Sequence, residues 1–217
     1  MSDLDNADRN SFRQPEEAKS YEGVEKFSQY FPTAKIFELN AGKVPPEAMR
    51  YFEEQSREYS QPAEDSSPAD FEKFLLVSHS DTESTVVAMQ TKIVGATQDE
   101  ERIAYFVDMS EGKKVGHGIM RNNISSPDAF LAGKPFSEFI FANENQRGQG
   151  RGRRLLKMMN ATSQAEYGLP LYSGMDMKDQ GRIAWQKLAD AGEARMFKEG
   201  TYDRYVMEFP FERTGAI

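Results

Sequence analysis

The chain has 217 residues, a formal net charge of −8, 38% hydrophobic residues and 29% charged residues. It contains no cysteine, which excludes disulfides, thiolate nucleophiles and cysteine-based zinc or iron–sulfur sites. The only two histidines, His79 and His117, lie in separate segments, so we expect no histidine-rich metal site and no metal cofactor. The acidic balance argues against nucleic-acid binding. No run of residues approaches the roughly 18 apolar positions that a membrane span requires.

The length of the chain predicts one domain, with or without a tail. Residues 1–30 are polar with only scattered apolar side chains, and we expect them to form a disordered tail ahead of a single domain over residues 31–212. The acidic N-terminus lacks the apolar segment of a secretory signal. Together with the absence of cysteine, this predicts a cytoplasmic protein.

Apolar runs and their spacing predict the elements of the domain in chain order. The first half is expected to contain a strand at 34–39, a helix that begins at Pro45 and Pro46, and strands at 74–77, 85–94, 102–107 and 115–120. The second half is expected to contain a strand at 137–142, a helix at 152–167, a strand at 171–177, a helix at 179–191 and a closing hairpin at 194–209. The helix at 179–191 should turn Ile183, Trp185 and Leu188 inward. This mixed order predicts an α+β fold with helices on the faces of a sheet.

The most specific feature is the glycine-rich stretch at 146–156, where three glycines alternate with large polar residues between an expected strand and an expected helix. Such a loop directs free backbone N–H groups and the positive end of a helix dipole at one point, as a pyrophosphate site requires. No Walker string of the form Gly-x-x-x-x-Gly-Lys-Ser/Thr occurs in the chain. A Rossmann fingerprint also fails, because its third glycine would fall on Arg153.

A glycine- and arginine-rich surface turn, or an RNA-binding Arg-Gly segment, is the alternative interpretation of this stretch. An RNA-binding segment of that kind would be longer, disordered and set in a basic chain. Here the stretch is short, lies between a strand and a helix, and belongs to an acidic chain. The pattern therefore favours a phosphate-binding loop.

Residues 147–152 read Arg-Gly-Gln-Gly-Arg-Gly and match the pattern Arg/Gln-x-x-Gly-x-Gly/Ala. This stretch resembles the acetyl-CoA loop of the GCN5-related N-acetyltransferase (GNAT) superfamily. The Leu155-Leu156 pair, the segment 178–188 and the closing strands at 202–209 are similar to the elements that follow in that family. The resemblance implies an acyl-CoA N-acyltransferase fold, with a mixed, mostly antiparallel central sheet of six to seven strands flanked by helices.

The same resemblance implies transfer of an acetyl group from acetyl-CoA to a primary amine by direct attack, without a covalent enzyme intermediate. The loop would hold the pyrophosphate, and the strand before it would pair with the pantetheine arm beside a widened gap next to 171–177. Arginine side chains of the loop could add charge-assisted contacts. The implied cofactor-binding residues are Phe141, Ala142, Asn143, Arg147, Gly148, Gln149, Gly150, Arg151, Gly152 and Arg153.

The amine must lose a proton before it attacks, and Glu138 on the strand before the loop is the candidate general base. An ordinary solvent-facing strand glutamate is the alternative interpretation of Glu138. The family commonly protonates the leaving thiolate with a tyrosine, but Trp185 occupies the corresponding place, and an indole N–H is not a usable acid. Tyr172, Tyr202, Tyr205 or water would then have to serve, or activity would be weak or lost.

The expected partner is a cationic amine acceptor on a small molecule, peptide or protein, with neither nucleic acid nor membrane involved. By resemblance, roughly 45–74 and 110–135 would recognise it. The sequence leaves the oligomeric state open between monomer and homodimer. The alternative function is a catalytically weak or inactive GNAT-like domain that binds coenzyme A or a protein partner.

Overall fold

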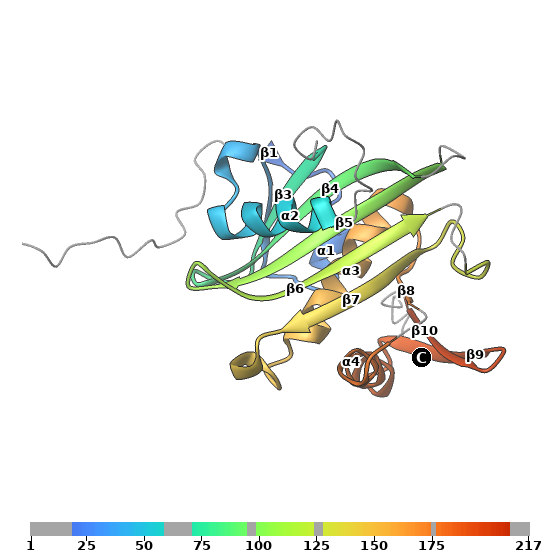
Figure 1. Ribbon diagram of the computed structural model, residues 1–217. Coiled ribbons are helices and arrows are strands. Elements are labelled where there is room, and N and C mark those ends of the chain that lie inside the picture. Colours follow the sequence, from blue (N-terminus) through green and yellow to red (C-terminus); the bar gives the residue numbers. More distant parts are fainter. Residues whose placement is uncertain (1–18, 59–70, 95–98, 124–127, 175–176, 209–217) are drawn as a thin grey trace, which may run out of the picture.

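A computed structural model describes residues 19–58, 71–94, 99–123, 128–174 and 177–208 (Figure 1). Within these ranges ten strands form one sheet, in the order β1-β2-β3-β4-β5-β6-β7-β8-β10-β9. The α+β class and the mixed, mostly antiparallel sheet are therefore confirmed. The expected number of six to seven strands is wrong, because strands from both ends of the chain extend the central meander into a single sheet.

The strands are β1 (Lys19–Ser20), β2 (Lys35–Leu39), β3 (Lys73–Ser78), β4 (Glu83–Val94), β5 (Asp99–Ser110), β6 (Lys113–Asn123), β7 (Pro135–Ala142), β8 (Tyr172–Ser173), β9 (Ala194–Glu199) and β10 (Tyr202–Met207). The helices are α1 (Val24–Ser28), α2 (Pro46–Glu58), α3 (Arg151–Tyr167) and α4 (Asp179–Asp190), with short 3-10 turns η1 (Ala41–Lys43) and η2 (Glu144–Gln146). None of these helices in the described ranges has the length and apolar character needed to cross a membrane.

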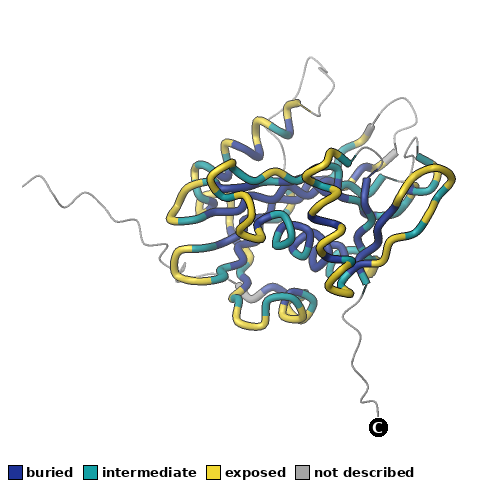
Figure 2. The backbone as a smooth tube through the Cα atoms, turned by 90° about the horizontal axis from the view of Figure 1, so that it is seen from below, coloured by how far each residue is buried: buried dark blue, intermediate teal, exposed yellow. Residues whose placement is uncertain are grey.

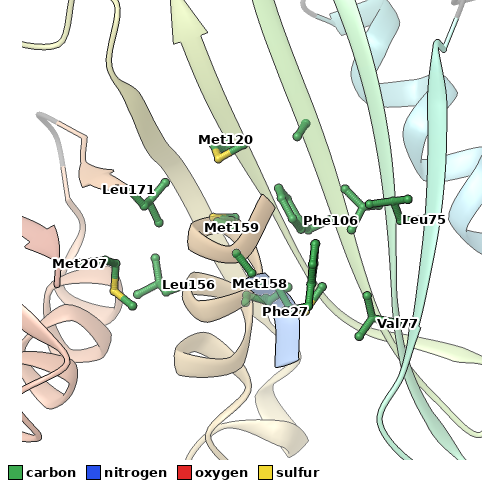
Figure 3. Packing of buried hydrophobic residues seen from close by; sticks show 14 of the residues in the cluster. Phe27, Leu75, Val77, Phe106, Met120, Leu156, Met158, Met159, Leu171 and Met207 are labelled. Carbon is green, nitrogen blue, oxygen red and sulfur yellow. The ribbon is translucent and has the colours of Figure 1, made fainter. Parts of the chain in front are cut away.

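Both faces of the sheet are buried, because apolar side chains alternate along the long central strands. Val86 of β4 belongs to the core under α2, whereas its neighbour Val87 belongs to the core on the opposite face. That second core is centred on α3, whose methionines and leucines pack between the sheet, α1 and α4 (Figure 3). Buried residues accordingly gather in the middle of the molecule, while exposed residues follow the turns at its edges (Figure 2).

Residues 19–28 are part of the folded domain rather than of a tail. β1 pairs with β2, and α1 packs against α3. Phe27 is 0% exposed, and the Tyr21 hydroxyl donates a hydrogen bond to Glu166 of α3. The expected boundary at residue 31 is therefore wrong, because strand pairing, helix packing and these two aromatic side chains join the polar segment to the domain. Residues 1–18 and the expected end at 212 lie outside the described residues.

β7 and β8 are the only parallel neighbours among the described strands, and they pair over a short length. Phe136 lies opposite Tyr172 and Ser137 opposite Ser173, and the pairing ends there apart from a hydrogen bond from the Gly174 N–H to the Ser137 carbonyl at 3.1 Å. A Cβ atom on Gly174 would lie 2.7 Å from that oxygen, so only glycine permits the contact. The rest of β7 continues without a strand beside it on this edge in the described structure.

Candidate functional site

A cavity of about 220 Å³ lies beside the unpaired end of β7. Its walls come from β7, the glycine-rich loop, the first turn of α3 and one side of α4. Eight of the ten residues expected to bind the cofactor line it: Phe141, Ala142, Arg147, Gly148, Gly150, Arg151, Gly152 and Arg153. Asn143 and Gln149 are not in the lining; the Asn143 amide instead donates a hydrogen bond to the Lys114 carbonyl at 3.1 Å. The structure thus brings most of the predicted residues together around one space.

The start of α3 presents backbone N–H groups at this cavity. Gly150 precedes the helix in the left-handed conformation, with φ of 79°, and makes no side-chain cap. The first bond at this end runs from the Arg154 N–H to the Gly150 carbonyl at 2.9 Å. Helix geometry therefore leaves the N–H groups of the three residues 151–153 without intrahelical acceptors, at the positive pole of the helix dipole. This arrangement suits an anion, and a phosphate in particular.

Two further glycines shape the loop. Gly148 also has a positive φ, of 81°, which a side chain would strain. A Cβ atom on Gly152 would lie 3.3 Å from Ile140 Cδ1 and 3.5 Å from the Ala184 Cβ. Glycine at this position lets α3 approach both β7 and α4 closely, and this close packing forms one wall of the cavity.

The loop arginines are less available to a ligand than the sequence suggested. The Arg151 side chain is 6% exposed, and its Nη2 atom lies 2.7 Å from Glu83 Oε1. Arg153 and Arg147 form looser, more exposed pairs at 3.6 Å, with Glu193 and Glu144 respectively. Both Nη atoms of Arg151 are thus paired inside the protein, and its backbone N–H at the helix start is open to a ligand. A charge-assisted contact from its side chain to the cofactor stays a prediction.

Helix α4 contributes lining residues that the sequence analysis did not assign: Gln180, Ile183, Ala184 and Lys187. Ile183 was expected in the core but is 46% exposed, whereas Trp185 and Leu188 are buried as expected. The signal was present in the spacing, since positions 180, 183, 184 and 187 fall on one side of a helix. It was missed because only tertiary packing shows that this side faces the loop.

Trp185 and the candidate tyrosines do not reach the cavity. Trp185 is 1% exposed and stacks on Tyr205, with ring centroids 5.9 Å apart. The Tyr205 hydroxyl donates a hydrogen bond to Gln186 at 3.0 Å. Tyr172 and Tyr202 are likewise absent from the lining. No tyrosine in the described part of the chain is therefore placed in this cavity to protonate a leaving group.

Glu138 occupies a β-bulge, because Ser137 and Phe139 pair with the adjacent residues Met120 and Ile119. Its carboxylate accepts a hydrogen bond from Arg121 Nε at 2.7 Å. Burial raises the pKa of Glu138, while the Arg121 charge opposes the rise. Glu138 is not in the cavity lining and lies two residues before Ile140, which is. The Glu138 carboxylate lies with Arg121 on the sheet face that α2 covers, whereas Ile140 packs on the face that α3 covers. Glu138 is thus a partly buried acid with an elevated pKa on the other face of β7.

The same guanidinium also binds Glu101, with 3.0 Å between Arg121 Nη1 and Glu101 Oε1. Two carboxylates thus share one cation on the sheet face that α2 covers, where Ile103 and Ile119 lie. Lys92 also interacts with Glu101 and with Arg121, so two cations accompany the two carboxylates here. The described residues contain no group of three or more acidic or histidine side chains arranged to hold a metal ion.

The cavity therefore combines an uncapped helix start with an unpaired strand edge. These features follow from the geometry of the described residues alone. The chain matches none of the protein-family models, curated proteins or solved structures with which it was compared.

Proposed function

We propose that the protein is an N-acetyltransferase that moves an acetyl group from acetyl-CoA to a primary amine, in an acyl-CoA N-acyltransferase fold. One observation carries the proposal: a single cavity joins the uncapped start of α3 to the unpaired edge of β7. The helix start suits a diphosphate. The strand edge suits an extended arm rich in amide groups, which can pair as an added strand.

The dimensions of β7 support this placement of the donor. From Ala142 back to Glu138 the strand extends about 13 Å, at roughly 3.3 Å per residue. An extended arm anchored at the loop and running along this edge would bring its thioester end toward Glu138. Exposed Phe141 and Ile183 give the cavity apolar surface for the arm.

The chemistry requires two proton losses from the acceptor nitrogen, one substitution at the thioester carbonyl and one proton gain by the sulfur. The acceptor ammonium loses a proton to Glu138, directly or through water, and the free amine attacks the thioester carbonyl. The new C–N bond forms as the C–S bond breaks. The acylated nitrogen then releases its second proton to solvent, and the departing thiolate takes a proton from solvent. The raised pKa of Glu138 supports a role as base. The proposed acceptor class is a cationic amine on a small molecule, peptide or protein.

Release of free thiol from acetyl-CoA, measured across a panel of amines, tests the activity. Wild-type protein should also show a higher melting temperature with saturating acetyl-CoA. Gly150→Glu should abolish both effects, because it adds a negative side chain at the phosphate site. Gly200→Glu is the matched control: Gly200 also has a positive φ, of 58°, and open space around it, but lies in the β9–β10 turn.

Gly200→Glu should destabilise the fold by a similar amount and leave cofactor binding intact. Equal stabilisation of wild type and Gly150→Glu by acetyl-CoA would overturn the site assignment. No stabilisation of wild type would overturn the donor assignment altogether.

A second candidate function is a catalytically weak or inactive domain that binds coenzyme A or a protein partner. The observation that favours it is the buried Trp185, together with the absence of a tyrosine from the lining in the described residues. Melting-temperature stabilisation without thiol release from any amine would support this candidate over the enzyme.

A further inference from the structure

Four charged side chains connect the first turn of α3 to the strands beneath it. We call Glu83, Asp108, Arg151 and Arg154 the clasp. Arg154 Nη1 lies 2.6 Å from Glu83 Oε2, and its Nη2 lies 2.6 Å from Asp108 Oδ2. Arg151 binds the same two acids, at 2.7 Å to Glu83 and 3.4 Å to Asp108. Each arginine therefore bridges β4 and β5.

The two acids of the clasp offset an unfavourable accumulation of positive charge at the start of α3. Cations near a helix N-terminus are unfavourable, and acids there are favourable. The first turn of α3 contains no acid, yet it carries Arg151 and Arg153 and is followed at once by Arg154. Glu83 and Asp108 supply from two strands the negative charge that the helix itself lacks.

The clasp is buried and has its own support. Asp108 is 0% exposed. It accepts a hydrogen bond from the Thr85 hydroxyl at 3.2 Å, and Thr85 in turn lies 2.9 Å from His79 Nε2. Because the single hydroxyl proton of Thr85 is given to Asp108, His79 Nε2 must be the donor in this chain. The terminal nitrogens of both arginines are paired with the two acids, whereas the Nε atoms of Arg151 and Arg154 are buried without a hydrogen-bond partner among the described residues.

The clasp also holds the other side of the glycine-rich loop. Arg151 Nη2 donates to Gln146 Oε1 at 3.1 Å. Gln146 ends η2 and immediately precedes the loop, and it lines the cavity. One guanidinium thus connects the residue before the loop with the helix after it, across the two positive-φ glycines.

We propose that Glu83 and Asp108 are positioning residues for the glycine-rich loop, acting through Arg151 and Arg154 to hold the N–H groups of the α3 start toward the cavity. The two positive and two negative charges of the clasp cancel, so it adds no net attraction for an anion. The clasp instead contributes by holding the glycine-rich loop in one conformation. Only the identity of the ligand rests on the proposed function; the ordering of the loop does not.

Hydrogen exchange of individual backbone amides in Asp108→Asn tests the proposal without any ligand. The amides of Arg154, Leu155 and Leu156 should exchange at least tenfold faster than in wild type, while those near the C-terminal end of α3 change less than threefold. Glu166→Gln is the matched control, since Glu166 binds Lys73 at 2.9 Å near the other end of the same helix. It should leave exchange at the N-terminal turn unchanged.

Uniformly faster exchange along α3, or unchanged exchange at its first turn, would overturn the proposal. If Asp108→Asn does not fold, Glu83→Gln, at the more exposed acid, should give the same pattern with a smaller increase. A coenzyme A titration of the same variants distinguishes the role of the clasp from the proposed function of the cavity. Asp108→Asn should raise Kd about tenfold and the KM for acetyl-CoA similarly, with kcat within twofold, and Glu166→Gln should change neither constant. If wild type binds no coenzyme A, the proposed function fails, and the exchange pattern still decides the role of the clasp.

Discussion

The two ends of α3 are built in opposite ways. At its C-terminal end Gly168 adopts a left-handed conformation, and its N–H donates to the Gln164 carbonyl at 3.1 Å. A further hydrogen bond joins the helix to the chain that follows it, because the Ser163 hydroxyl donates to the Leu169 carbonyl at 2.6 Å. At its N-terminal end Gly150 makes no side-chain cap. One end is closed by local hydrogen bonds, and the other is left open to a cavity and held by acids from distant strands.

Because of this difference, we expect the closed end of α3 to contribute to the stability of the fold and the open end to contribute to ligand binding. Changes at the closed end should lower the free energy of unfolding and leave the ligand unaffected. Changes at the open end should alter ligand binding as well. Four measurements test whether the two ends differ in this way.

The largest effect on stability is expected for Asn160→Ala in the half of α3 nearest its closed end. Asn160 is fully buried, accepts the Leu171 N–H at 2.8 Å and donates to the Tyr30 hydroxyl. Its loss leaves buried polar groups unpaired and should cost about 3 kcal/mol of unfolding free energy, measured by urea denaturation. The Kd for acetyl-CoA should stay within threefold, and a tenfold rise would contradict the contrast.

Acid should weaken the open end through His79. Burial, with the Arg154 charge as a smaller cause, lowers the pKa of His79 to about 4. The fold therefore favours neutral His79, so this stability is present above about pH 6.5 and is lost as pH falls toward 4. Between pH 7 and pH 4.5 the loss should be about 2 kcal/mol. Burial raises the pKa of Asp108 to about 6, which acts in the opposite direction.

The contribution of His79 is therefore read as a difference between wild type and His79→Gln. Denaturation across this pH range should show a shallower decline for the variant than for wild type. Parallel curves for the two proteins would show that His79 is not held neutral by the fold.

Paired glycine substitutions compare the two ends directly. Gly150→Ala and Gly168→Ala both place a side chain at a positive φ, of 79° and 67°, with open space around it. Each should cost about 1 kcal/mol of stability. Only Gly150→Ala should weaken acetyl-CoA binding, by about tenfold in calorimetric titration. Equal loss of affinity in both would mean that the substitutions act through the whole helix.

The smallest effect is expected on the α4 side of the cavity. Lys187 lines the cavity and is exposed, and no ion pair involving it is found in the described part of the structure. Lys187→Ala should raise the Kd for acetyl-CoA three- to fivefold, as suits an exposed charge contact, and more so at low salt. Arg182→Ala, on the same helix but outside the lining, is the control and should leave Kd unchanged. The same rise in both variants would indicate a general charge effect.

Much of the fold could be predicted from the sequence, since periodicity located the central strands and the three long helices α2, α3 and α4. β1 and α1 could not, because two aromatic residues in a polar segment carry no periodic signal. The glycine pattern of the loop predicted a binding site there, and eight of the ten residues expected to bind the cofactor line the cavity. The internal ion pairs of Arg151 could not be predicted, because its partners Glu83 and Asp108 are 68 and 43 positions away in the chain. The α4 wall was missed for the same reason, since it depends on how two helices pack.

We propose the open end of α3 as the binding site for coenzyme A. The most direct measurement is a nuclear magnetic resonance titration that follows the backbone amides of the glycines as acetyl-CoA is added. The amides of Gly148, Gly150 and Gly152 should shift progressively and saturate, while those of Gly168 and Gly200 stay in place. Saturating acetyl-CoA that leaves the three loop glycines unmoved would contradict the claim.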